Sequence, residues 1–481
     1  MLFAEDGQLP CTVGGSLTSP FWEAVYISCD GWVATRKEQD SFGTVEIPQE
    51  ALYGIQTVRA LQNLSFSGKR LGQYPTYIAA LAQVKKAAAR ANERAGVLAA
   101  DICAAIEKAC DELIAGAHLE HFPVDMLHGG GGIGTNMNVN EVIANLANGH
   151  AGMAHGTYSP VHPVDHVNAS QSTSDVCHTA MRMAIVQEYE GLNELLARMQ
   201  KTWERLTTNL MSVTTIARTC LQDGMRVQLG ETFSGYGAVI GRRHAALTHA
   251  VQQLNAVNLG GTVIGSGVGA PKAYRDAVLS ELCEVSGQKL HHRENLFDAA
   301  QNMDDLAQVS AQLSLLATCL LKISKDLRLL SSGPEAGFAE ITLPGVQAGS
   351  SFFPGKINPV VPETLIQSCF QVLGCDRVVQ ATLAHGELDL NVFEGAAGAN
   401  ILDALQMLKQ SLALFHEKCL AGIEANEARC AELANSFIPL VVELKEKHGY
   451  SFVSRLLKEQ GREGVKSFSR NGGHHSERDK C

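Results

Sequence analysis

The sequence predicts an all-α fold in which long helices pack into a bundle. Aromatic residues make up only 6% of the 481 residues although 45% are hydrophobic, a composition more typical of packed helices than of a β-sandwich. Apolar residues also recur at alternating intervals of three and four positions, at Leu306, Val309, Leu313, Leu316, Leu320, Ile323, Leu327 and Leu330. This spacing places one apolar stripe along about 36 Å of helix. Such a stripe needs a partner helix from the same subunit or from a neighbouring one.

Three further segments have the helical period. They comprise a stripe from Ile78 to Ala91 (Ile78, Leu81, Val84, Ala88, Ala91) and the segments Leu192–Leu206 and Leu402–Leu414. No strands alternate with these helices, so a doubly wound sheet is excluded. Gly-rich loops are expected to join the rods of the bundle.

The charge and cysteine content exclude several classes of function. Lys and Arg total 39 against 50 Asp and Glu, which gives a net charge of −11 and argues against nucleic acid or an anionic membrane as partner. The 13 cysteines show no Cys-x-x-Cys pair or zinc-ligand spacing, so we expect reduced thiols, no metal site and a cytoplasmic location. Val309–Leu321 is too interrupted to span a membrane, the N-terminus lacks a secretory signal, and the His474-His475 pair is read as part of a polar tail.

Two stretches before predicted helices carry unusual residue types. Residues 128–138 contain four successive glycines ahead of a helix expected from Asn140; their free N–H groups could cradle an anion, or the glycines could simply serve a tight turn with positive φ. This stretch lacks the Gly-Lys-Ser/Thr ending of a phosphate loop. Residues 162–175 carry four hydroxyl residues within positions 170–174, which suits either a helix N-cap or donors to a carboxylate.

A third stretch, Gly349–Pro359, combines two serines with Lys356 and Asn358 in a loop punctuated by Gly and Pro. A loop rich in donors and holding a cation suits the binding of a carboxylate, although a solvated turn would look similar. Residues 265–269 resemble a dinucleotide fingerprint only superficially, because no strand precedes them.

In this order and spacing the three stretches resemble the aspartase/fumarase superfamily, and most closely its aspartate ammonia-lyases. The third matches the Gly-Ser-Ser-x-x-Pro-x-Lys-x-Asn-Pro loop of that family, and the resemblance extends from Gly43 to Lys466 through Tyr53–Thr57, Asn136–Asn145, Arg218-Thr219, Leu221–Asp223 and Asn391–Phe393. It implies a homotetramer, active sites built from three subunits and reversible β-elimination from a small carboxylate without a cofactor. It also implies a three-domain all-α fold, which we divide into an extension (1–32), an N-terminal helical domain (33–171), a central bundle (172–428) and a small C-terminal domain with its tail (429–481).

The resemblance also assigns roles by position. Ser350 is the expected base, with its alkoxide stabilised by backbone N–H groups and by Lys356. The expected clamp for the carboxylate beside the leaving group consists of Lys356, Asn358 and Thr219. The group beside the abstracted proton would be held by Ser172, Thr173 and the backbone at Ser351, and Thr135 is counted among the substrate-binding residues.

The sequence departs from the family pattern around the leaving amino group. Ile133 and Gly134 replace a Thr-Ser pair, Ser174 replaces Asn, Cys220 replaces His, and Phe352-Phe353 replace an aliphatic-Met pair. A primary ammonium without acceptors would be costly there, whereas a quaternary ammonium donates no hydrogen bonds and prefers apolar or aromatic surroundings. We therefore hypothesise a leaving group bulkier than ammonia, namely trimethylamine. That reaction resembles ergothionase, which converts ergothioneine to thiolurocanate.

Other interpretations remain open. The chain could be an aspartate ammonia-lyase that forms fumarate and ammonia, or an inactive structural relative comparable to the lens crystallins of the superfamily. A plain coiled-coil interaction protein would explain the stripe but not the hydroxyl and glycine clusters. Cys220 suits a space-filling role better than a catalytic thiol, and structural capping is the expected role of His128, His162 and His166.

Overall fold

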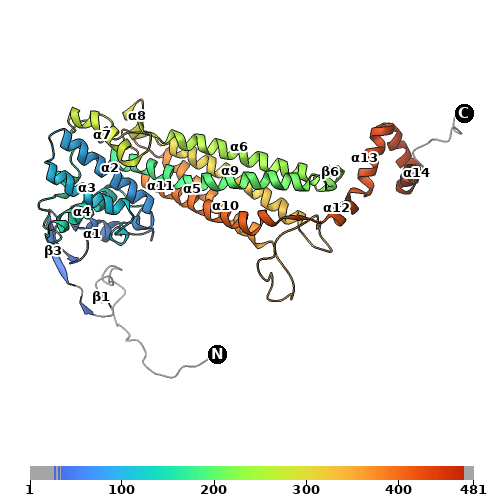
Figure 1. Cartoon of the computed structure of the whole chain (residues 1–481), viewed down its shortest axis with the longest axis horizontal. Helices are drawn as coiled ribbons and strands as arrows, with labels where there is room; N and C mark the ends of the chain where they lie inside the picture. Colours follow the sequence, from blue (N-terminus) through green and yellow to red (C-terminus); the bar gives the residue numbers. More distant parts are fainter. Residues whose placement is uncertain (1–26, 29–30, 33, 471–481) are drawn as a thin grey trace, which may run out of the picture. The chain divides into compact units, whose positions relative to one another are not determined.

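The computed structural model describes residues 27–28, 31–32 and 34–470 (Figure 1). Most of the expected extension and most of the polar tail, including the His474-His475 pair, lie outside the described residues. Helices dominate the described chain, and its strands form only two-stranded sheets, so the expected all-α class is confirmed.

The chain divides into two compact units, each described here by itself. The first comprises the described residues up to Met181 together with Val257–Gln301 and Glu387–Gly395. The second comprises Arg182–Ala256, Asn302–Gly386 and the described residues from Ala396 onward. The finer division into three domains stays a prediction.

Short helices packed around α2 form most of the first unit. Its helices are α1 (Ile55–Leu64), α2 (Pro75–Arg94), α3 (Ala100–Ile114), α4 (Ile133–His150), α7 (Lys272–Ser286), α8 (Leu296–Gln301) and the first turns of α5 (Thr173–Leu210). Helix α2, which contains the predicted stripe from Ile78 to Ala91, packs against both α3 and α7, and α4 packs against α1 and α3. The apolar stripe is therefore buried in the centre of this unit.

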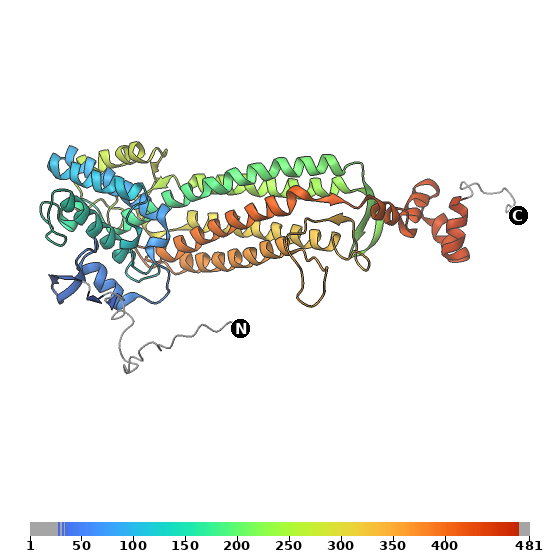
Figure 2. The ribbon, with the colours of Figure 1, turned by 60° about the horizontal axis from the view of Figure 1, so that its bottom comes forward.

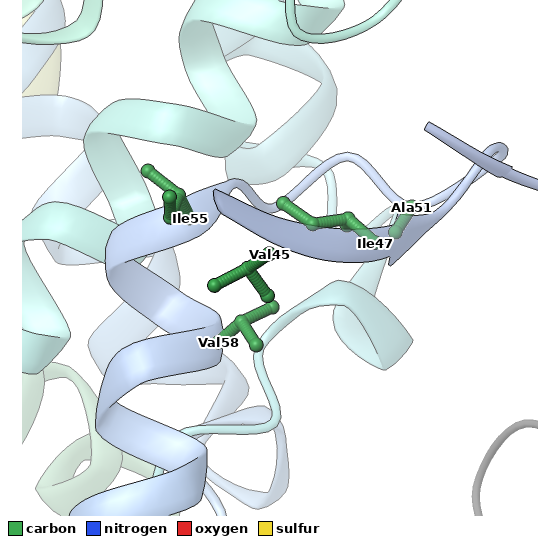
Figure 3. Close-up of a cluster of buried hydrophobic side chains, with 5 residues drawn as sticks. All are labelled: Val45, Ile47, Ala51, Ile55 and Val58. Atoms are coloured by element: carbon green, nitrogen blue, oxygen red, sulfur yellow. The ribbon is translucent and has the colours of Figure 1, made fainter. Parts of the chain in front are cut away.

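A hairpin covers one side of α1. Strands β3 (Thr35–Asp40) and β4 (Gly43–Pro48) pair antiparallel, and every second residue of β4 is buried, as the pleat requires. Figure 3 shows Val45 and Ile47 of this strand meeting Ala51, Ile55 and Val58 in a small apolar cluster. This cluster fixes the hairpin to the beginning of α1.

The second unit contains a bundle of long helices that run side by side (Figures 1 and 2). They are the remainder of α5, α6 (Leu229–Gln253), α9 (Asp304–Leu330), α10 (Val360–Ala384) and α11 (Glu394–Lys418), whose first two residues belong to the first unit. Helix α9 packs against α6 and α10. Further contacts link the remaining neighbours in the bundle. Helix α10 contacts α11 through a hydrogen bond between Ser368 and Ser411, and α11 contacts α5 through an ion pair between Lys409 and Glu188. Helix α5 contacts α6 through the packing of Trp203.

Helix α9 confirms the most regular prediction from the sequence. Its stripe is buried from Leu306 to Leu327, and only Leu330 at the end is partly exposed. Within the described chain, α9 is the one helix long and apolar enough by composition to cross a membrane, and half of its most apolar window is buried. Its contacts with α6 and α10 are those of a core helix in a bundle.

The second unit also contains a smaller group of elements besides the bundle helices. Strands β5 (Thr214–Thr219) and β6 (Gln222–Gln228) form a hairpin that packs against α12 (Glu427–Ala434). Helices α13 (Phe437–His448) and α14 (Tyr450–Arg470, kinked at Gly461) enclose an apolar cluster that includes Leu444 and Val453. The remaining elements are short: β1 (Ile27–Ser28), β2 (Gly31–Trp32), β7 (Ala256–Val257), β8 (His291–His292), β9 (Ile341–Thr342), β10 (Glu424–Ala425) and the single turns Leu71–Gln73, Leu119–His121, Pro163–Val167 and Leu420–Gly422.

Candidate active site

The glycine-rich stretch forms a tight entry into α4. Gly130, Gly131 and Gly132 have φ values of +89°, +63° and +90°, a region that favours glycine strongly. The expectation of positive φ is thus confirmed, but the helix begins at Ile133, seven residues before the predicted start at Asn140. The helix starts early because the glycines complete the turn by themselves. The candidate residues Ile133, Gly134 and Thr135 consequently lie in its first turn.

His128 caps this helix. Its Nε2 accepts the backbone N–H of Thr135 at 3.1 Å and lies 3.2 Å from the Thr135 hydroxyl, while Nδ1 lies 2.8 Å from the carbonyl of Gly129. A neutral imidazole that accepts at Nε2 donates from Nδ1, so both ring nitrogens are satisfied. The volume that we expected Gly134 to open for the leaving group is occupied by this ring, whose Nε2 would be 3.0 Å from a Cβ at position 134. Ile133, by contrast, leaves 45% of its surface exposed in this chain.

The hydroxyl-rich stretch begins α5. Ser172 donates its backbone N–H to Asp175 Oδ1 at 2.9 Å, and Asp175 Oδ2 accepts the N–H groups of Gly260 and Thr262, each at 3.0 Å. Burial raises the pKa of Asp175 to about 6, against the opposing effect of these three hydrogen bonds. Ser174 lies with its hydroxyl 2.9 Å and 2.7 Å from the carbonyls of Thr262 and Val263. The beginning of α5 is thereby fastened to the loop after β7.

A buried lysine that we did not identify from the sequence lies behind this stretch. Lys85 of α2 donates to the side-chain oxygens of Asn136 at 2.8 Å and Asn168 at 3.0 Å. Asn136 in turn donates from Nδ2 to the hydroxyl oxygen of Thr173 at 3.2 Å. Burial lowers the pKa of Lys85 to about 7. The one signal in the sequence was a lysine placed directly after Val84 of the apolar stripe.

In the second unit, the loop between β9 and α10 encloses Ser350. The hydroxyl oxygen of Ser350 accepts the backbone N–H groups of Phe352 at 3.0 Å and Phe353 at 2.9 Å. The base of the loop is closed by a hydrogen bond from Gly349 N to Lys356 O at 2.8 Å and by one from the Asn358 side chain to Gly349 O at 2.7 Å. Gly349 suits this closure, because a Cβ there would lie 2.6 Å from Asn358 N.

The same loop presents aromatic surface and a cation. The rings of Phe352 and Phe353 meet edge to face with centroids 4.8 Å apart, and 81% and 56% of their respective surfaces are exposed. The ammonium of Lys356 lies 5.8 Å from the centroid of the Phe353 ring. Lys356 and Asn358 also line a cavity of about 800 Å³ together with Arg328 of α9. Arg328 forms an ion pair with Glu363, which lines the same cavity, at 3.2 Å, so Lys356 is the cation that suits a carboxylate ligand there.

Thr219 and Cys220 lie where the β5–β6 hairpin turns. Thr219 pairs with Gln222, and the two residues between them, Cys220 and Leu221, have φ values of +54° and +58°. Positive φ at both central positions defines a type I′ turn, whose twist matches that of the strands. Cys220 is exposed. The hairpin is anchored by Arg218, which pairs with Glu340 at 2.5 Å.

The other two loop histidines also act as local caps, as expected. His162 Nδ1 accepts the backbone N–H groups of Val164 at 3.3 Å and Asp165 at 3.1 Å. His166 Nδ1 accepts the N–H of His162 at 2.9 Å. Both rings are therefore engaged with the backbone of the stretch 162–167.

The structure thus gathers the predicted residues into three groups. In the first unit, the first turns of α4 and α5 lie together, because Asn136 bonds to Thr173; they carry Ile133, Gly134, Thr135, Ser172, Thr173 and Ser174. In the second unit, one loop carries Ser350, Ser351, Lys356 and Asn358, and the hairpin turn carries Thr219 and Cys220. Each group places hydroxyl or cationic side chains at the start of a helix, in a loop or in a turn.

Comparison with known proteins shows the family of the chain. A family model described as a lyase matches residues 43–374. The chain is 41% identical to the aspartate ammonia-lyase of Pseudomonas fluorescens over 442 residues, which cover 91% of this chain and 92% of that protein. It is 38% identical to the fumarate hydratase class II 1 of Pseudomonas aeruginosa over 432 residues, covering 90% and 93%.

Solved structures show the same fold. The structure of a fumarate lyase:delta crystallin from Brucella melitensis bound to cobalt superimposes with a TM-score of 0.88 at 41% identity, covering 92% of this chain and 96% of that one. A class II fumarase from Schistosoma mansoni superimposes with a TM-score of 0.85 at 30% identity, covering 91% and 93%. The fold is therefore that of the fumarase-like lyases. More specifically, the chain belongs to the aspartase/fumarase superfamily, with aspartate ammonia-lyases among its relatives at about 40% identity.

Proposed function

We propose that this lyase removes an amine from an amino-acid-derived carboxylate by β-elimination, with Ser350 as the base. The observation that carries the proposal is the pair of backbone N–H groups, from Phe352 and Phe353, that point at the Ser350 hydroxyl oxygen. Serine is a weak base, and its alkoxide needs such preorganised donors, since hydrogen bonds to a charged oxygen are stronger than those to a neutral one. Lys356, from the same loop, adds positive charge.

The Ser350 alkoxide takes a proton from one carbon, the electron pair of that C–H bond forms the new C=C bond, and the amine leaves from the adjacent carbon with the electrons of the C–N bond. Lys356, Asn358 and Thr219 hold the carboxylate beside the leaving group. The group beside the abstracted proton, on which negative charge accumulates, is held by Ser172, Thr173 and the backbone at Ser351, with Thr135 nearby.

The proposal requires that several copies of the chain assemble to complete each active site. The three groups of residues would meet in a homotetramer whose sites each combine three subunits. No cofactor is assigned, because the base, the clamp and the charge-stabilising donors are all supplied by side chains and backbone of this chain.

We further propose that the leaving group is trimethylamine, released from the quaternary ammonium of ergothioneine, with thiolurocanate as the second product. The side chains of Ile133, Gly134 and Cys220 offer no oxygen or nitrogen acceptor to a primary ammonium, and the Ser174 hydroxyl lies against two backbone carbonyls. Phe352 and Phe353 supply exposed aromatic surface, which suits a methylated cation. Because His128 fills the space at Gly134, the proposal places the methylated cation against Ile133 and the aromatic pair rather than in a space opened by Gly134.

L-Aspartate is the second candidate substrate. It is favoured by 41% identity to an aspartate ammonia-lyase over about nine tenths of both chains. The retained Lys356, Asn358 and Thr219 would serve the carboxylate of aspartate equally well.

A substrate panel separates these candidates. Purified protein is incubated with L-aspartate, fumarate plus ammonia, histidine, hercynine and ergothioneine, and both the released amine and the absorbance of the conjugated product are measured. Trimethylamine from ergothioneine supports the first candidate, and turnover of L-aspartate alone supports the second. Absence of turnover with every member of the panel would contradict the proposed function and favour a structural role.

A further inference from the structure

Lys85 is a buried cation whose hydrogen-bond acceptors are neutral. Its side chain is fully buried in α2, and its ammonium donates to the amide oxygens of Asn136 and Asn168 at 2.8 Å and 3.0 Å. The charged or titratable groups that face it are Asp175 and Cys177 from α5 and Cys110 from α3. A buried ammonium is costly, and surface ion pairs such as those of the adjacent Lys86 are the usual arrangement for lysine. Lys85 therefore acts on its surroundings through its hydrogen bonds to Asn136 and Asn168.

The contact with Lys85 fixes the orientation of the Asn136 side chain. Because the amino group of Lys85 donates to Asn136 Oδ1, the amide nitrogen of Asn136 faces the opposite side. There it donates to Asn168 Oδ1 at 3.0 Å and to the hydroxyl oxygen of Thr173 at 3.2 Å. Since Asn168 Oδ1 also accepts from Lys85, the three side chains hold one another in a single arrangement.

This arrangement sets the direction of the Thr173 hydroxyl. Because its oxygen accepts a hydrogen from Asn136, its own proton points away from Asn136 and is available to another acceptor. Thr173 is the first residue of α5, and the positive end of the helix dipole favours negative charge there. A hydroxyl fixed as a donor at this position suits a carboxylate or a developing anion.

We propose that Lys85 is a positioning residue for the reaction: acting through Asn136, it holds the Thr173 hydroxyl as a hydrogen-bond donor to the side of the substrate on which negative charge accumulates. This inference rests on the proposed function, because it requires that Thr173 contact the substrate. It predicts that reversing the direction of the bond between Asn136 and Thr173 reduces turnover even when the fold is kept.

The test variant is Asn136→Asp. An aspartate at this position still accepts from Lys85, so the buried cation keeps its partner, but a carboxylate cannot donate to Thr173 and would draw the hydroxyl proton toward itself. We expect kcat to fall about tenfold with a KM change of less than about threefold, since the lost bond is strongest when charge has developed. The variant also loses the bond from Asn136 to Asn168, so its melting temperature is measured beside its kcat. Lys85→Met, which removes the support of Asn136, is the second variant, with Lys86→Met as its matched control.

A double-mutant cycle separates positioning from a general structural effect. In a Thr173→Val background, Asn136→Asp should change kcat by less than about twofold, because the group through which it acts is gone. The inference is overturned if Asn136→Asp keeps the kcat of the wild type, or if its full effect persists in the Thr173→Val background. A wild-type protein inactive on the whole substrate panel would instead overturn the proposed function, and the inference with it.

Discussion

The imidazole of His128 lies against Gly134 and occupies the place that a side chain at position 134 would need. A Cβ added there would be 3.0 Å from Nε2 and 3.1 Å from Cε1 of His128, and 3.2 Å from a methyl of Val124. Gly134 and His128 therefore form a matched pair at the beginning of α4: the histidine caps the helix because the glycine leaves it room.

The first prediction concerns this pair. Gly134→Ser, which restores the family residue, should lower the melting temperature by several degrees, because overpacking of a buried site costs about 1–3 kcal/mol. Differential scanning fluorimetry measures the shift. Gly129→Ser is the matched control, since a Cβ at Gly129 has no atom within 4 Å. The cost of Gly134→Ser should be smaller in a His128→Ala background, and an equal cost in both backgrounds would refute the pairing.

The second prediction concerns the base. Ser350→Ala removes the hydroxyl but keeps the loop closure by Gly349 and Asn358, so it should reduce kcat on the true substrate about 10³-fold at an unchanged melting temperature. Released amine gives the rate. Ser454→Ala, at an exposed position of α14, should behave like the wild type. Undiminished turnover in Ser350→Ala would remove Ser350 from the mechanism.

The third prediction concerns the leaving group. Cys220→His restores the family residue at a turn position with φ +54°, a conformation that histidine tolerates better than most side chains. An added imidazole supplies an acceptor for a primary ammonium, so the ratio of L-aspartate turnover to ergothioneine turnover should rise about tenfold. Leu221→His, at the other central position of the same turn, is the control. An unchanged ratio in Cys220→His would mean that position 220 does not contact the leaving group.

The fourth prediction concerns pH and stability. Burial lowers the pKa of Lys85 from 10.5 to about 7, so between these values the unfolded chain binds a proton that the folded chain has released. The contribution of Lys85 to the free energy of unfolding should therefore rise from about pH 7 toward pH 10 and stay constant below pH 7. The facing thiol of Cys177 stays protonated over most of this range, because burial raises its pKa to about 12.

Urea unfolding of wild type and Lys85→Met at several pH values isolates this contribution. The difference in free energy of unfolding, wild type minus variant, should grow as the pH rises from about 7 to about 9.5. Parallel pH dependences in the two proteins would show that Lys85 keeps an ordinary pKa in the fold.

Much of the fold follows from periodicity in the sequence. The stripe from Leu306 to Leu330 predicted α9 almost residue for residue, since burial of one helix face dictates the spacing. The β5–β6 hairpin was not predicted, because its turn is made by Cys220 and Leu221 rather than by Asn-Gly, which signals such turns. A turn of this kind is imposed by the packing of the flanking strands.

The candidate site was predictable in part. The loop around Ser350 and the beginning of α5 were located from their residue types, the start of α4 was predicted seven residues too late, and the capping role expected of His128 is confirmed. Lys85 was missed because its partners, Asn136 and Asn168, lie 51 and 83 positions away along the chain. A long-range contact of this kind leaves no periodic pattern in a single sequence.

The three glycines before α4 restrict which positions at the start of this helix can be exchanged. Gly130, Gly131 and Gly132 are confined by their own backbone torsions, so exchange at these positions is penalised whatever the chemistry of the neighbouring ligand. Ile133 and Gly134, one step further along, adopt ordinary helical torsions and are free of that restriction. Exchange at this helix start is thereby least restricted at Ile133, which meets neither the torsional restriction of the glycines nor the packing of Gly134 against His128.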